Sequence, residues 1–168
     1  MPVWGYFVLG FIILALVLLT ARQNQVAYRE TPLDYGADFR AVLESSAPAV
    51  EELRQALAEA TRDGDPQVLS RAAASARSHI HANISNLDRL GFPESASDAD
   101  RELLTELRLK LRQAMENYEW AARIAETTDL LENQGLRRAF ESLVASGDQL
   151  CFDTRLQLVA LGPTVAEG

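Results

Sequence analysis

The side chains that could bind a metal or act as a nucleophile are few: His79, His81 and Cys151. On a helix, residues two apart point about 200° away from each other, so the two histidines cannot chelate one ion. The residues three before them are Ala76 and Ser78, so the Glu-x-x-His pairs of di-iron bundles are missing from the sequence. We therefore expect no metal and no cofactor, with His81 facing solvent and His79 flanking the core.

Cys151 has an acidic neighbour, Asp153, whereas a reactive thiol needs electropositive surroundings. We expect this cysteine to fill space on a helix face, as free cysteines commonly do. The sequence contains no zinc-ligand spacing, glycine-rich phosphate loop or nucleophile elbow. These observations predict that the protein is not an enzyme.

Three polar residues, Ser46, Asn83 and Thr154, occupy positions in otherwise apolar helical stripes. A buried polar residue of this kind can fix the register of packed helices. The alternative role is to line a site for a small polar ligand.

Four segments carry apolar residues at alternating intervals of four and three, the pattern of a helix with one buried face. These segments begin near residues 39, 66, 98 and 136 and end near residues 62, 90, 131 and 161. Asp65 before Pro66 and Ser97 before Asp100 predict helix N-termini, and Pro48 predicts a kink or a restart near residues 45–47. Short turns favour antiparallel neighbours, so we predict an all-α, up-down-up-down four-helix bundle over residues 38–162 and a tail over 163–168.

The stretch Val3–Thr20 contains eighteen residues without a charge, twelve of them Leu, Ile, Val or Phe. Those twelve favour membrane insertion by about −4 to −7 kcal/mol in sum, and the helix would be about 27 Å long. Trp4 and Tyr6 suit the membrane interface. We predict one N-terminal transmembrane helix within residues 1–21, contact with the lipid bilayer through residues 3–20, and a linker over residues 22–37.

A cleaved signal peptide is the alternative interpretation of this stretch. No Lys or Arg precedes the apolar run, and cleavage after Ala21 would place the bulky Leu19 at the −3 position, which argues against cleavage. Arg22, Arg29 and Arg40 follow the run and favour a cytoplasmic bundle, with the periplasmic side as the other possibility.

The chain carries a formal net charge of −8, which argues against nucleic-acid binding because phosphate contacts depend on Lys and Arg. Lys110 is the single lysine, a bias that together with abundant alanine is typical of GC-rich bacterial genomes. A single-pass protein of the bacterial inner membrane is therefore expected.

Trp120, Phe152 and Leu109 each fall two positions after a core residue, which points them outward, unless the register is shifted by one. Exposed large apolar groups mark interaction surfaces when they cluster. We expect them to contact other membrane protein subunits, in a non-catalytic accessory, structural or adaptor subunit of a larger membrane protein complex. The alternative is a membrane-tethered sensory or small-ligand-binding bundle.

Overall fold

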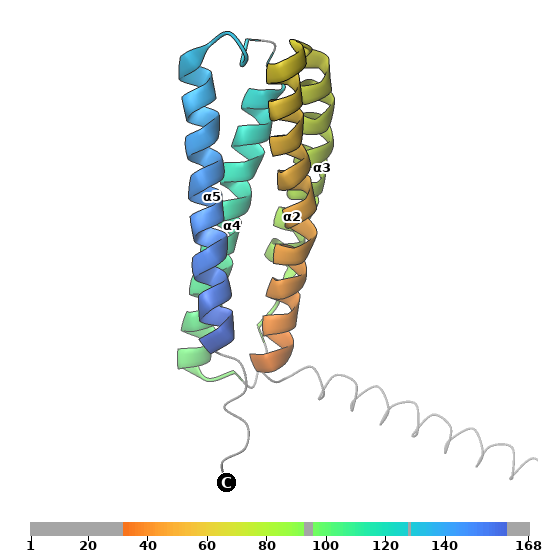
Figure 1. The fold of residues 1–168 in the computed structure, drawn as a ribbon. Helices are drawn as coiled ribbons and strands as arrows, with labels where there is room; N and C mark the ends of the chain where they lie inside the picture. Colours follow the sequence, from red (N-terminus) through yellow and green to blue (C-terminus); the bar gives the residue numbers. More distant parts are fainter. Residues whose placement is uncertain (1–31, 93–95, 128, 161–168) are drawn as a thin grey trace, which may run out of the picture.

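A computed structural model describes residues 32–92, 96–127 and 129–160 of the chain. This part contains four α-helices and no strand: α2 (Pro32–Asp63), α3 (Pro66–Arg89), α4 (Asp98–Ala125) and α5 (Gln134–Ala160). The helices lie side by side in a four-helix bundle, and the connections between them alternate between its two ends (Figure 1). The predicted transmembrane helix, its interface residues Trp4 and Tyr6, and the tail lie outside the described residues.

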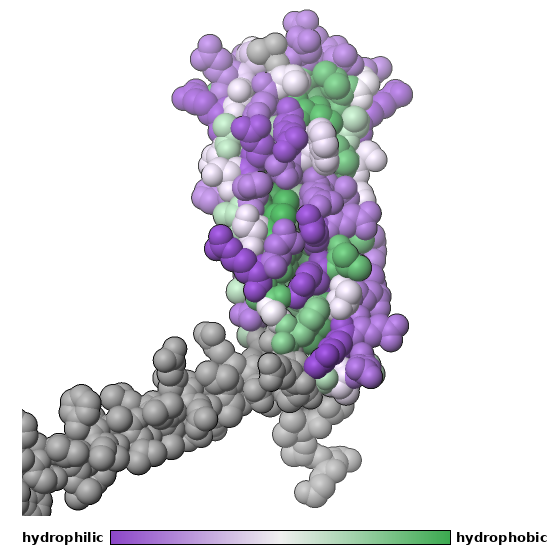
Figure 2. All heavy atoms as spheres, turned by 180° about the vertical axis from the view of Figure 1, so that it is seen from behind, coloured by the Kyte–Doolittle hydropathy of each residue, from purple (hydrophilic) through white to green (hydrophobic). Residues whose placement is uncertain are grey.

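The apolar stripes predicted from spacing form the core. Every described stripe position is buried or half-buried, and the largest fully buried side chains come from all four helices. Those side chains are Phe39, Leu53, Leu69, Ile80, Leu87, Leu107, Leu111, Met115, Leu158 and, in the α4–α5 connection, Leu130, together with the smaller Thr154. The outside is mostly hydrophilic, with hydrophobic groups in a narrow lengthwise strip on the face that Figure 2 shows. The fold is therefore held by side-chain burial along the helix seams.

The helix ends follow the predicted capping chemistry. The Asp65 carboxylate accepts the Gln67 N–H (2.9 Å), and Pro66 occupies the first turn of α3, where its missing N–H is not needed. Ser97 Oγ accepts the Asp100 N–H (3.2 Å) at the start of α4. Gly64 adopts φ 71°, a conformation that glycine accepts without strain, and its N–H bonds to Ala60 O (2.9 Å) to close α2.

Helix α2 differs from the sequence prediction in two ways. It begins at Pro32, so residues 32–37, which were predicted to be linker, are helical. It also runs without interruption through Pro48, so the predicted restart near residues 45–47 does not occur. Proline is compatible with the first turn of a helix, which explains the early start. At Pro48 the tertiary packing of the buried neighbours Ala49 and Val50 outweighs the lost backbone hydrogen bond.

Helix α4 also ends earlier than predicted. Helix α4 ends at Ala125 instead of near residue 131, and Thr127 Oγ1 donates to Ile124 O (2.6 Å) just beyond the end. Such side-chain bonds compete with helix continuation. The turn that follows buries Leu130 completely, and Asn133 Oδ1 then accepts the N–H groups of Gly135 and Leu136 at the start of α5.

Candidate partner-binding groove

Helices α2 and α5 close the bundle, yet they touch far less than the three pairs of consecutive helices. A cavity of about 470 Å³ lies between them near the middle of the bundle. Its lining includes Leu43, Ser46, Val50, Arg54, Tyr118 and Phe152. A second cavity of about 230 Å³ extends the same seam toward the start of α2 and the end of α5, and Leu43 and Arg155 line both cavities. We call the two cavities together the α2/α5 groove.

An ion pair crosses this groove. The Arg54 guanidinium on α2 donates to Asp148 Oδ2 on α5 and lies 3.5 Å from Glu51 Oε2. The Tyr118 hydroxyl, which comes from α4, donates to the other Asp148 oxygen (2.7 Å). The pKa of Arg54 is raised, because its bonds to Asp148 outweigh the desolvation that would lower it. Asp148 therefore joins α2, α4 and α5 through two donors.

Tyr118 and Cys151 form the buried floor of the groove, with the hydroxyl 3.7 Å from Cys151 Sγ. Desolvation raises the pKa of the Tyr118 hydroxyl far above its usual range, and burial also raises the pKa of the Cys151 thiol. Both groups are therefore protonated at neutral pH. A protonated thiol is neither a nucleophile nor a metal ligand, which agrees with the predicted space-filling role of Cys151.

The second cavity is lined by apolar groups from α5 and by three charged groups. Leu158 and Val159 provide the apolar wall, and Arg40, Glu44 and Arg155 surround it. Arg54 is already paired, but Arg40 and Arg155 make no ion pair within the described part of the chain. This end of the groove therefore carries two guanidinium groups that no described acidic side chain pairs with.

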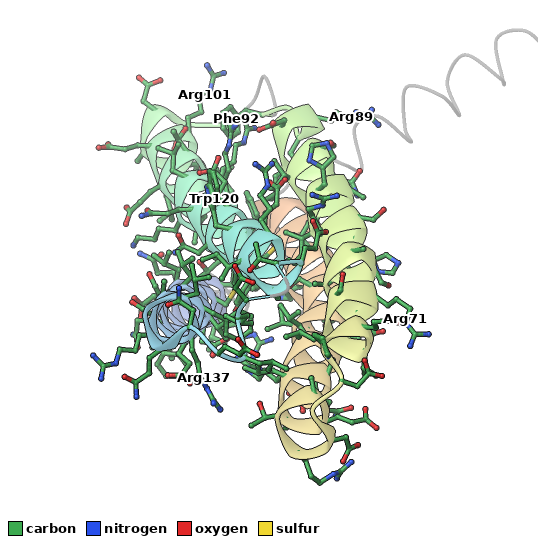
Figure 3. The ribbon with its side chains drawn as sticks, turned by 90° about the horizontal axis from the view of Figure 1, so that it is seen from above. Arg71, Arg89, Phe92, Arg101, Trp120 and Arg137 are labelled. Carbon is green, nitrogen blue, oxygen red and sulfur yellow. The ribbon has the colours of Figure 1, made fainter. Side chains whose placement is uncertain are left out.

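The three predicted partner-binding residues are exposed, and they lie on two different faces. Their exposed fractions are 60% for Leu109, 56% for Trp120 and 56% for Phe152. Phe152 borders the α2/α5 groove. Leu109 and Trp120 are eleven residues apart, about three turns, and so share the exposed side of α4, the helix on which Figure 3 labels Trp120. The Trp120 ring is covered by the Arg123 guanidinium, 4.8 Å from the ring centre.

Two further exposed apolar residues were missed by the sequence analysis: Leu156 (54% exposed) and Val159 (74% exposed). With Phe152 they follow the spacing of four and three, so they form one row along α5. We call Phe152, Leu156 and Val159 the α5 row. A signal was present in the sequence, because Leu156 and Val159 lie on either side of the buried Leu158 and cannot share its face.

The polar members of the buried stripes have separate roles. Ser46 Oγ donates to Leu43 O (3.1 Å) and lines the groove, as the ligand-site alternative requires. Asn83 Oδ1 accepts from Ser45 Oγ (3.0 Å), which connects α3 to α2. Thr154 Oγ1 donates to Leu150 O (2.8 Å) within its own helix. The structure therefore does not bring the three residues together into one site.

The two histidines lie on the outside of α3. His79 is exposed, so the prediction that it flanks the core was wrong, while His81 faces solvent as expected. His81 Nδ1 lies 3.8 Å from Glu119 Oε1 on α4, and Arg123 holds the same oxygen at 2.8 Å. Within the described ranges, no three His, Cys, Asp or Glu side chains are grouped as a metal site would need.

Among the described helices, none is long and apolar enough to cross a membrane. Comparisons with protein-family models, with curated proteins and with solved structures find no match to this chain.

Proposed function

We propose that this chain is a non-catalytic, membrane-anchored adaptor, an accessory subunit of a larger membrane protein complex. The observation that supports it is the α5 row, three large apolar side chains more than half exposed, of which Phe152 and Val159 line the groove. Single exposed apolar residues are common, but a contiguous row bordering a concave surface is typical of an interaction site.

The anchor in this proposal is Val3–Thr20, and its support comes from the sequence. Helix α2 begins and α5 ends at the same end of the bundle (Figure 1). A bundle attached through the residues before α2 would therefore stand on the membrane with this end nearest to it. We place the protein in the bacterial inner membrane as a single-pass protein with a cytoplasmic bundle.

The test is purification of the full chain from native membranes in mild detergent, followed by mass spectrometry. We expect stoichiometric membrane protein partners, and we expect Phe152→Ser with Leu156→Ser to release them. The control pair, Leu109→Ser with Trp120→Ser, changes the outer side of α4. Release by the control pair alone would move the contact to that side, and purification of the wild type as a lone monomer would refute the proposal.

A second candidate is the binding of a small ligand, favoured by the size and chemistry of the larger cavity. Its volume of about 470 Å³ lies in the range of ligand sites, and Ser46, Tyr118 and Arg54 place polar groups in its lining. A metabolite that raises the melting temperature of the wild type, but not of Tyr118→Phe or Arg54→Met, would support this candidate.

A further inference from the structure

We infer that the α2/α5 groove receives an amphipathic helix of a partner protein, whose apolar face covers the α5 row and whose acidic side chains pair with Arg40 and Arg155. This inference rests on the proposed adaptor function and names the part of the partner that is bound.

The shape of the surface suits a helix. Phe152, Leu156 and Val159 span about 10 Å along α5, and the two cavities continue beside them parallel to the helix axes. Large apolar side chains at intervals of three and four on a docked helix would enter the cavities, the usual mode of helix-in-groove recognition. The lining of α2 extends from Arg40 to Arg54, about 21 Å, so the docked helix needs about 14 residues.

The charges favour an acidic helix. Arg54, Glu51 and Asp148 already satisfy one another in the middle of the groove. The described charged groups that line the second cavity are Arg40, Arg155 and Glu44, two positive charges against one negative. This local excess of positive charge lies on a chain with a net charge of −8, so an acidic side chain is attracted to this end of the groove more than to other surfaces.

The chain itself offers no occupant that fits as well. A second copy would bring another net charge of −8 against the first, which opposes association. As a helix, residues 161–168 would span only about 12 Å of the groove. Glu30 is the single acidic residue before α2 starts, beside Arg22 and Arg29. We therefore infer that the helix bound in the groove belongs to a different protein.

The experiment is site-specific photocrosslinking of the full chain in its native membrane. Leu156→p-benzoylphenylalanine places the probe in the α5 row, and Leu109→p-benzoylphenylalanine places the control on the outer side of α4. We expect an adduct at position 156 whose cross-linked peptide, identified by mass spectrometry, is an amphipathic helix with Asp or Glu beside its apolar face. Arg40→Glu with Arg155→Glu should reduce the adduct at least tenfold, and Arg40→Lys with Arg155→Lys should retain most of it.

Several outcomes would overturn the inference. These are a cross-linked peptide from this chain, a lipid or small-molecule adduct, an adduct that charge reversal does not reduce, or no adduct at position 156. The Glu variants must keep the wild-type melting temperature, and charge swap on the identified partner helix should restore the adduct. If partners co-purify but only position 109 yields an adduct, the groove assignment fails and the adaptor function stands; if nothing co-purifies, both fail.

Discussion

Helix α5 meets its two neighbours in opposite ways. Against α4 it packs tightly, because Gly147 leaves room for the Tyr118 ring: a Cβ at Gly147 would lie only 2.5 Å from Tyr118 Cε1. Side-chain bonds flank this contact, from Asn117 to Ser146 (3.0 Å) and from Lys110 to Gln157 (3.2 Å). Against α2 the same helix leaves a groove, which among the described residues one ion pair crosses, between Arg54 and Asp148.

The difference shows how one bundle can be both stable and open. Most contacts between helices lie in the three seams of consecutive helices, so we expect the α2/α5 seam to contribute less to stability. Tyr118 belongs to both regions, since its ring packs on Gly147 and its hydroxyl reaches Asp148 in the groove. Packing in the tight α4/α5 seam therefore positions Tyr118, which forms part of the floor of the α2/α5 groove.

The largest change in the free energy of unfolding is expected at Gly147, in the tightly packed α4/α5 seam. Gly147→Leu forces a side chain into the space of the Tyr118 ring, and we expect it to lower the free energy of unfolding by about 3 kcal/mol. The control, Ala145→Leu, lies on the exposed side of the same helix and should change it by less than about 0.5 kcal/mol. Urea unfolding followed by circular dichroism measures both, and equal effects would show that the α4/α5 seam is not tight.

Pro48 tests whether the backbone of α2 is strained beside the groove. Pro48→Ala restores an N–H that can bond to the Glu44 carbonyl, so we expect the free energy of unfolding to rise by about 1–2 kcal/mol. Pro66→Ala is the matched control, because a proline in the first turn blocks no helical bond and its removal should give no gain. A destabilised Pro48→Ala variant would mean that the proline fits the helix better than alanine.

The pH dependence of stability reports on the buried floor of the groove. The pKa of Cys151 is raised in the folded state, so its stabilising contribution is complete below the unfolded pKa and is lost as the pH rises toward the folded pKa. Because one proton is involved, the decline between the two pKa values is at most about 1.4 kcal/mol per pH unit. Unfolding titrations between pH 7 and 9.5 should show this decline in the wild type and a weaker one in Cys151→Ala; identical slopes would place the thiol in contact with solvent.

The smallest effect is expected for the ion pair across the groove. Arg54 and Asp148 have side chains 39% and 46% exposed, so a double-mutant cycle with Arg54→Met and Asp148→Asn should yield a coupling of about 0.2–1 kcal/mol. Salt at 1 M should reduce this coupling, because exposed charges are screened. A coupling above about 2 kcal/mol would show that this ion pair holds α2 and α5 together more strongly than expected for two partly exposed side chains.

The helices could be predicted because burial and capping are local in sequence. The intervals of four and three identified the buried faces of all four helices, and Asp65 and Ser97 marked two starts correctly. The start of α2 was missed because Pro32 and Gly36 resemble loop residues. In the structure, Gly36 is buried, and a Cβ at this position would meet the Leu158 side chain (3.9 Å). That contact depends on the tertiary fold.

The groove itself could be predicted only in part. Phe152 was identified as outward-facing, but Leu156 and Val159 were not, because the stripe of α5 drifts near Gln157 and both were assigned to neither face. The distance between α2 and α5 depends on how side chains from three helices fill the space between them. No spacing within one helix contains that information, so the two cavities and the Arg54–Asp148 pair appear only in the folded chain.

The start of α2 and the end of α5 lie at the same end of the bundle (Figure 1), which bears on how far the bundle reaches. Helix α5 contains 27 residues and is therefore about 40 Å long. For a chain tethered just before α2, the turns after α2 and α4 would extend farthest from the membrane, and the arginine-lined end of the groove would lie closest to it. A partner helix would then need to extend only a few turns beyond the bilayer to reach the groove. In a partner with a longer extramembrane domain, the groove would bind the part nearest to the membrane.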